Sequence, residues 1–475
     1  MVRYRGAAAQ KVFIVSLGCP KNLTDAEVMA GSLAAAGFEL TSDESLADVA
    51  LINTCAFLSS AVKESETEIR RFISLKERGK ISKIAVTGCL VEREKDAILR
   101  KFPQIDAVVG IHSLESINSA INGGERFIMS PAAALSAPKL KLRLTAPHSA
   151  YLKIADGCDN RCSYCAIPAI RGRFRSKTIE EAVAEAKDLA GSGAREISLI
   201  AQDTTSYGAD IYGRPRLADL LKELVKIDRI KWLRLMYTYP ERLSAEILRL
   251  VRDEEKICHY IDMPLQHAAD SMLRMMNRRS TGRSIRKKIA DIRKAAPDIA
   301  LRTSFIVGFP GETEKDFEEL RGLVAETRFD NVGVFTYSRE PGTPAAGLPG
   351  QVPEKVKLAR MNELVSVQSG IIDGINRGLA GRTVRVLLDS PAFGRTYRDA
   401  PDIDGKVEII TAAISHKPEA IGGKRKMADG LKPAASGSTV QGHALKAGEF
   451  VDVKITGTAG YLRRGIVVPA KGDIK

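Results

Sequence analysis

Three cysteines at short spacing are the strongest chemical signal in this sequence. Cys158, Cys162 and Cys165 form the pattern Cys-x3-Cys-x2-Cys within Cys-Asp-Asn-Arg-Cys-Ser-Tyr-Cys. Thiolate sulfur is a soft ligand that suits iron–sulfur clusters, and three thiolates can bind three irons of a cubane. The fourth iron then keeps an open coordination position, as reactive metal sites do. The loop therefore predicts a catalytic 4Fe–4S cluster; a structural zinc loop is the alternative, although no fourth Cys or His follows within it.

A second set of cysteines is spread over the first ninety residues. Cys19, Cys55 and Cys89 each follow an apolar run that is typical of a strand. The carboxyl ends of parallel strands lie along one edge of a sheet, so the three sulfurs can meet there. We therefore predict a second three-thiolate cluster. The alternative is three unrelated buried cysteines, because cysteine is often buried. Cys258 has no partner at metal-ligand spacing and is predicted to be structural.

The elements that must position this second set alternate between strand and helix from residue 11 to about 130. Near-continuous apolar strands followed by amphipathic helices indicate a parallel sheet covered by helices. The predicted strands are Lys11–Leu17, Ala47–Asn53, Lys83–Thr87 and Asp106–Val109, and the predicted helices are Thr24–Gly37, Ser59–Arg78 and Glu92–Lys101.

A longer series of the same kind surrounds the cysteine loop. Six strands alternating with helices predict a barrel or an open wound sheet. The loop follows the first of these strands at its carboxyl end, where α/β active sites lie. The predicted strands are Tyr151–Ala155, Glu196–Ala201, Trp232–Tyr237, His259–Met263, Ala300–Val307 and Asn331–Thr336.

Changes in composition divide the chain into three predicted domains. The first, an α/β domain, covers residues 10–125, and a linker rich in proline, alanine and lysine covers 126–147. The second covers 148–376 and ends on a long amphipathic helix. Short strands with glycine turns over 381–475 predict a small β-barrel, interrupted by a flexible loop at Pro418–Ala444.

Composition limits the class of protein. The chain has 475 residues, and 44% of them are hydrophobic, which suits about three globular domains. An odd number of cysteines argues against a disulfide framework and favours a reducing, cytoplasmic setting. No run is long enough to cross a membrane, so we expect no membrane partner. The net charge of +14 favours a polyanionic partner such as nucleic acid, with a merely solvated basic surface as the alternative.

The cysteine loop resembles the cluster motif of the radical S-adenosylmethionine superfamily, and Tyr164 before the last cysteine fits that pattern. The resemblance implies a six-stranded partial barrel in which S-adenosylmethionine binds the open iron and yields a radical. Gly308, Gly311 and Glu312, after the fifth barrel strand, and Gln202, after the second, are the implied cofactor-binding residues. For each of them an ordinary polar or glycine-rich turn is the alternative.

Two cysteine triads in this order resemble the methylthiotransferases, over nearly the whole chain. The resemblance implies two 4Fe–4S clusters, S-adenosylmethionine as cofactor and a C-terminal TRAM domain. Ser16-Leu-Gly-Cys-Pro-Lys-Asn-Leu23 and Arg395-Thr-Tyr-Arg-Asp-Ala-Pro-Asp-Ile-Asp-Gly405 resemble the branch that modifies an aspartate of ribosomal protein S-twelve. Enzymes that modify adenosine in transfer RNA usually have Gly-Cys-Gln-Met-Asn at the first of these places.

The resemblance implies sulfur insertion and methylation at the β-carbon of that aspartate. Expected partners are ribosomal protein S-twelve within the small subunit, ribosomal RNA through Gly423-Lys-Arg-Lys426, and a reductant such as flavodoxin or ferredoxin. A transfer-RNA adenosine methylthiotransferase is the first alternative. An RNA-binding module with structural metal is the second, and a ferredoxin-like electron carrier is the third.

Overall fold

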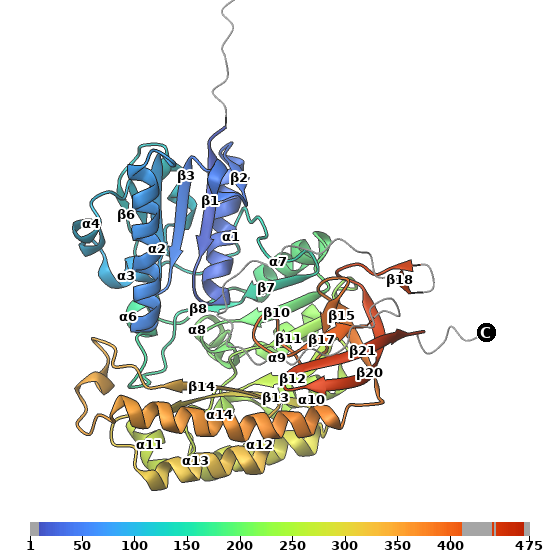
Figure 1. Cartoon of the computed structure of the whole chain (residues 1–475). Helices are drawn as coiled ribbons and strands as arrows, with labels where there is room; N and C mark the ends of the chain where they lie inside the picture. Colours follow the sequence, from blue (N-terminus) through green and yellow to red (C-terminus); the bar gives the residue numbers. More distant parts are fainter. Residues whose placement is uncertain (1–8, 411–438, 441–442, 470–475) are drawn as a thin grey trace, which may run out of the picture.

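Two parallel sheets and a small closed barrel follow one another along the chain (Figure 1). The computed structural model describes residues 9–410, 439–440 and 443–469. Most of the predicted loop Pro418–Ala444, including Gly423–Lys426, lies outside these residues. Among the described residues, no helix combines the length and apolar character needed to span a membrane.

The N-terminal sheet is parallel throughout and has the strand order β2-β1-β3-β4-β5-β6. One apolar core packs beneath α2 and α3, and another packs beneath α1 and α5 on the opposite face. The strands are β1 (Lys11–Ser16), β2 (Glu39–Thr41), β3 (Val49–Thr54), β4 (Lys83–Gly88), β5 (Ala107–Val109) and β6 (Phe127–Ile128). The helices are α1 (Pro20–Ala35), α2 (Ser59–Glu77), α3 (Cys89–Glu94), α4 (Ala97–Lys101) and α5 (Ile117–Ile121).

Two helices of this domain differ from the sequence prediction. Helix α1 begins at Pro20 rather than Thr24, because proline is well suited to the first position of a helix. The single helix predicted over Glu92–Lys101 is divided into α3 and α4. Lys95, between them, has a φ of 51°, which a continuous right-handed helix does not allow.

The second sheet contains the six predicted strands. They are all parallel and lie in the order β14-β13-β12-β11-β10-β7. A short antiparallel pair, β8 (Ala155–Asp156) and β9 (Arg175–Ser176), brackets the cysteine loop and α6 (Ile167–Arg171). The six strands are β7 (Ser149–Lys153), β10 (Glu196–Ile200), β11 (Trp232–Leu235), β12 (Ile257–Asp262), β13 (Ala300–Val307) and β14 (Asn331–Thr336). The helices are α7 (Ile179–Gly191), α8 (Ala209–Tyr212), α9 (Leu217–Leu224), α10 (Ala245–Asp253), α11 (Asp270–Met275), α12 (Gly282–Ala295), α13 (Glu314–Thr327) and α14 (Glu354–Arg377).

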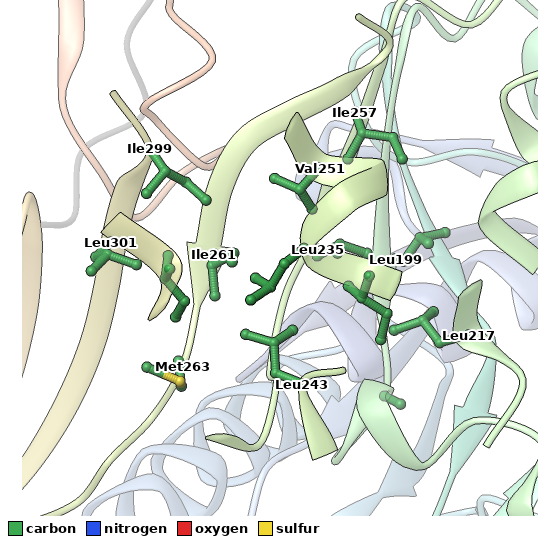
Figure 2. Packing of buried hydrophobic residues seen from close by; sticks show 14 of the residues in the cluster. Leu199, Leu217, Leu235, Leu243, Val251, Ile257, Ile261, Met263, Ile299 and Leu301 are labelled. Atoms are coloured by element: carbon green, nitrogen blue, oxygen red, sulfur yellow. The ribbon is translucent and has the colours of Figure 1, made fainter. Parts of the chain in front are cut away.

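Buried aliphatic residues join this sheet to its outer helices (Figure 2). Leu199, Leu235 and Ile261 lie on successive strands and pack toward Leu217 and Val251 of the helices. Alternate strand residues form a second cluster on the inner face, which includes Tyr151, Ile200, Trp232, Met236 and Tyr260.

The C-terminal strands close a barrel in the order β15-β16-β17-β21-β20. This barrel covers the inner face of the preceding sheet, since Leu387 and Ala400 belong to the same buried cluster as Trp232. Arg395 and Arg234 both pair with the fully buried Glu196, at 2.6 and 2.7 Å. The strands are β15 (Thr383–Leu388), β16 (Phe393–Arg395), β17 (Lys406–Ile409), β20 (Phe450–Ala459) and β21 (Leu462–Val468), and β18 (Thr439–Val440) pairs with β19 (His443–Ala444).

Candidate active site

The first cysteine set lies just beyond three neighbouring strand ends. Ser16 of β1 pairs in register with Asn53 of β3, and Asn53 pairs with Thr87 of β4. Cys19, Cys55 and Cys89 follow these residues by three, two and two positions, so the sheet brings them to one edge. Cys55 and Cys89 are buried, whereas Cys19 is exposed.

Two glycines allow the backbone to approach these cysteines closely. Gly18 has a φ of +91°, and a Cβ there would lie 2.8 Å from the Sγ of Cys55. Gly88 has a φ of +97°, and its Cβ would lie 2.3 Å from the carbonyl oxygen of Thr54. Both conformations favour glycine, and neither site has room for a larger residue.

Asn22, in the first turn of α1, connects the strand ends to the cysteines. Its Nδ2 donates to the carbonyl oxygens of Leu17, at 3.0 Å, and Thr54, at 2.9 Å. Its Oδ1 lies 3.4 Å from the Sγ of Cys89. The amide therefore fixes the turn that carries Cys19 relative to the ends of β3 and β4.

Arg171 of α6 joins the two domains from a position that is 1% exposed. Its Nη2 donates to Asp25 at 2.9 Å and to Asn22 at 2.7 Å, and it lies 3.6 Å from the Sγ of Cys89. Its Nη1 donates to Asp156, just before the cysteine loop, at 3.0 Å. Burial alone would raise the pKa of Asp156, but Arg171 and Lys153 hold that pKa well below its usual range. The guanidinium is therefore a fixed positive charge beside the first cysteine set.

The second set is held in a compact loop. The amide of Cys158 donates to the carbonyl of Gly172 at 3.1 Å, and the amide of Cys165 donates to the carbonyl of Cys162 at 3.2 Å. The hydroxyl of Tyr239 lies 3.5 Å from the Sγ of Cys162, and Arg278 lies 3.9 Å from the same sulfur. A hydroxyl group and a guanidinium group therefore both lie beside this sulfur.

Burial raises the pKa of several thiols in the two sets. The pKa is about 11 for Cys158 and about 12 for Cys89 and Cys165. Because metal ligation requires the thiolate, cluster binding at these residues would release protons.

The segment after β11 contacts Cys162 of one cysteine set and a residue close to Cys19 of the other. The ring centroid of Tyr237 lies 3.1 Å from the Nζ of Lys21, two residues after Cys19. Tyr239, two residues further along, contacts Cys162. Both sets therefore lie at the carboxyl-end rim of the second sheet, on the side that the N-terminal domain covers.

The remaining predicted site residues differ in what they contact. Gln202 donates to Asp156 at 2.9 Å, and its buried Oε1 has no hydrogen-bond partner among the described residues. Tyr164 packs at the border of an apolar cluster that contains Phe309. The carboxylate of Glu312 accepts hydrogen bonds from the amides of Gly308 and Phe309, so it shapes the glycine-rich turn from within.

The two glycines of that turn are closely covered by other side chains. A Cβ on Gly308 would lie 2.2 Å from the Cγ of Lys357, and one on Gly311 would lie 3.2 Å from the Cε of Met275. Cys258 lies within β12 and is 2% exposed, in the cluster that fills the inner face of the sheet.

The donor sets suit iron–sulfur clusters. Each set consists of thiols alone, with a hydrogen-bond donor or a cation near one sulfur: Arg171 near Cys89, and Tyr239 near Cys162. Among the described residues, no three Cys, His, Asp or Glu side chains meet around the position of one metal ion. A cubane needs a wider arrangement, since each thiolate binds a separate iron.

Four residues near the cysteines are absent from the site predicted from sequence: Asn22, Arg171, Lys21 and Tyr237. Asn22 and Lys21 lie in the Cys-Pro-Lys-Asn stretch quoted above, so their closeness to a cysteine was the available signal. Arg171 and Tyr237 had no comparable signal, because their partners lie 82 and 216 residues away in the chain.

Two family models match the chain. Residues 11–110 match "Uncharacterized protein family UPF0004", and residues 152–324 match "Radical SAM superfamily". A solved structure of the radical S-adenosylmethionine methyltransferase TsrM from Kitasatospora setae has a similar fold. Its TM-score is 0.52 at 15% identity, covering 71% of this chain and 77% of that one.

Curated relatives match nearly the full length. The ribosomal protein uS12 methylthiotransferase RimO of Elusimicrobium minutum is 50% identical, over 96% of this chain and all of the relative. The RimO of Acetivibrio thermocellus is 41% identical, over 97% of this chain and 98% of the relative. Because these relatives are 41–50% identical over nearly the full length of both chains, this chain belongs to the RimO family of radical S-adenosylmethionine methylthiotransferases.

Proposed function

We propose that this protein inserts sulfur and a methyl group at the β-carbon of an aspartate in ribosomal protein uS12, the S-twelve protein of the small subunit. The observation that carries the proposal is the placement of two three-thiol sets at one rim, linked by Arg171 and the Tyr237–Tyr239 segment. Sulfur insertion at an unactivated carbon requires a radical source and a sulfur source near the same substrate atom. Two separate sites remote from each other would not meet that requirement.

The cysteines divide between two 4Fe–4S clusters. Cys158, Cys162 and Cys165 would hold the catalytic cluster with S-adenosylmethionine, and Cys19, Cys55 and Cys89 would hold the second. When bound, these groups supply the radical that removes hydrogen, the inserted sulfur and the methyl group. Among the described residues, Gln202 and Glu312 each have a buried oxygen without a hydrogen-bond partner that could bind the cofactor. The other predicted cofactor-binding residues are Tyr164, Gly308 and Gly311.

The protein's own residues orient these groups and keep water out. Four of the six cluster cysteines are buried, and Cys165 is half-buried, which limits the access of water to reactive intermediates, whereas Cys19 is exposed. Arg171 holds the Cys89 sulfur and the segment before Cys158 in one ion-pair network, so the two sites keep a fixed separation. Asp156 stays ionised there and can only accept hydrogen bonds.

The relatives' names carry the proposal of uS12 as substrate, and the charge of +14 agrees with a target embedded in ribosomal RNA. We further propose a cytoplasmic location, a flavodoxin or ferredoxin as reductant, and a TRAM role for the closed C-terminal barrel. The domain limits 10–125, 148–376 and 381–475 belong to the same proposal.

Mass spectrometry of a deletion strain tests the function directly. We expect uS12 to lose a methylthio group from one aspartate, and a plasmid-borne copy of this chain to restore it. Nucleosides of transfer RNA are measured from the same cells. If uS12 keeps its modification while a transfer-RNA adenosine loses one, the transfer-RNA alternative is correct. Purified protein that carries only zinc and does not cleave S-adenosylmethionine would favour an RNA-binding module.

A further inference from the structure

Lys21 is a buried cation that has no carboxylate partner among the residues that the structure describes. It is 6% exposed and lies in the first turn of α1, two residues after Cys19. Within the described ranges its Nζ makes no hydrogen bond or ion pair, and its described contact is the face of Tyr237, 3.1 Å from the ring centroid. An aromatic ring attracts a cation, but it leaves the ammonium donors without acceptors.

Three neighbouring cations differ from Lys21 because each pairs with carboxylates. Arg171 and Lys153 share Asp25 and Asp156. Arg302 pairs with Asp262 at 3.0 Å and with Asp404 at 3.2 Å. The carboxylates in these pairs therefore already have cationic partners, and none of them pairs with Lys21. Arg278 makes no ion pair among the described residues, but its Nη2 donates to the carbonyl of Pro264 at 3.0 Å.

The Cys19 thiol, when ionised, and the carboxylate of Asp262 are the negative charges that act most strongly on Lys21, but the oxygens of Asp262 are used elsewhere. One oxygen accepts from Arg302, and the other accepts from the amide of Tyr237 at 2.9 Å. The backbone at Tyr237 has a φ of 59°, a conformation uncommon for a tyrosine. A buried, unpaired charge is costly and is normally matched by an ionic partner.

We propose that Lys21 binds the side-chain carboxylate of the substrate aspartate. This inference rests on the proposed function and names the residue that selects its substrate. The β-carbon of an aspartate is bonded directly to its carboxyl carbon. A carboxylate bound at Lys21 therefore places the β-carbon beside Cys19 and the first cysteine set, where sulfur has to be delivered.

The chemistry of the two candidate substrates agrees with this role. An adenine base offers no negative charge for a lysine to bind. A carboxylate does, and a charge-assisted hydrogen bond to it is among the stronger polar contacts in proteins.

The test compares Lys21→Met with Lys63→Met in the full-length, anaerobically reconstituted protein. Lys63 is an exposed residue of α2, so its replacement removes the same charge away from the site. The ligands are purified uS12 and uS12 with the target aspartate changed to asparagine. The readouts are the Kd from calorimetry, the iron and sulfide content, and cleavage of S-adenosylmethionine without substrate.

We expect Lys21→Met to weaken binding of uS12 by about tenfold or more, with iron, sulfide and cofactor cleavage unchanged. The asparagine substrate should bind Lys21→Met and the wild type equally weakly, and Lys21→Arg should keep most of the affinity. Lys63→Met should bind uS12 as the wild type does.

Unchanged affinity in Lys21→Met, while the wild type modifies uS12, overturns the inference alone. Loss of iron from Lys21→Met also overturns it, because Lys21 would then serve the cluster and not the substrate. Wild-type protein that fails to modify uS12 overturns the proposed function, and the inference with it.

Discussion

The two cysteine sets reach the same rim by different structural means. The barrel set lies within eight residues of sequence, in a loop closed by its own backbone and by the β8–β9 pair. The N-terminal set needs three strands in correct register, a helix turn held by Asn22 and an arginine from the next domain. The barrel set is therefore a local structure, whereas the N-terminal set depends on the sheet and on the domain interface.

Removing one set at a time should separate the two sites most sharply. Replacing Cys158, Cys162 and Cys165 with alanine should abolish cleavage of S-adenosylmethionine and remove about half of the iron. Replacing Cys19, Cys55 and Cys89 should remove a similar share of iron but keep the cleavage. Iron and sulfide quantitation with a cleavage assay measures both effects. Loss of all iron from either variant would show that the sets do not form independent clusters.

Arg171→Met should affect the N-terminal set through the interface. The change leaves the carboxylates of Asp25 and Asp156 buried, with Lys153 as their remaining cationic partner. This should lower the free energy of unfolding by about 3–5 kcal/mol. We expect iron to be lost from the N-terminal set first, with faster hydrogen exchange in α1. Arg173→Met is the matched control, since that side chain is 89% exposed. Equal exchange rates in the two variants would contradict a role of Arg171 at the interface.

Gly88→Ala tests whether the N-terminal set needs its close strand-end packing. The new Cβ would meet the Thr54 carbonyl at a positive φ, so we expect about 2–3 kcal/mol of destabilisation and a lower iron content. Gly37→Ala carries a similar φ of +88° but has nothing within 4 Å of the new Cβ. Its cost should be about 1 kcal/mol, from the backbone alone. Thermal unfolding of both variants measures the difference, and equal shifts would show that packing at Cys89 is unimportant.

Tyr239→Phe should have the smallest effect and should be confined to the barrel set. Its hydroxyl can donate to the Cys162 sulfur, and a hydrogen bond of this kind is worth about 1 kcal/mol. For one electron that corresponds to a decrease of roughly 40 mV in the reduction potential of the bound cluster. A redox titration followed by electron paramagnetic resonance measures the shift. A change in the N-terminal cluster instead would contradict the assignment of Tyr239.

Much of the fold could be predicted because its signals are periodic. The β13 and β14 strands match the predicted ranges, since apolar runs between helices leave little ambiguity. The break at Lys95 and the three-residue strand β16 were not predicted. Neither has a local pattern long enough to be distinguished from a continuous helix or a turn.

At the site, sequence spacing indicated the cysteines but not the residues that hold them. Asn22 and Arg171 act through contacts between segments far apart in the chain, which spacing cannot predict. The backbone contacts of Glu312 could not be predicted either. One carboxylate oxygen of Glu312 accepts from the amides of the glycine-rich turn, and its contact with the cofactor stays a prediction.

The C-terminal barrel has a consequence for the order in which the protein folds. Leu387 and Ala400 complete the buried interior of the six-stranded sheet, and Arg395 neutralises Glu196 inside it. During synthesis this interior stays exposed to water until nearly four hundred residues have left the ribosome. The middle domain therefore finishes folding only after the C-terminal barrel has been synthesised. A fragment that ends after α14 would aggregate through its uncovered aromatic residues.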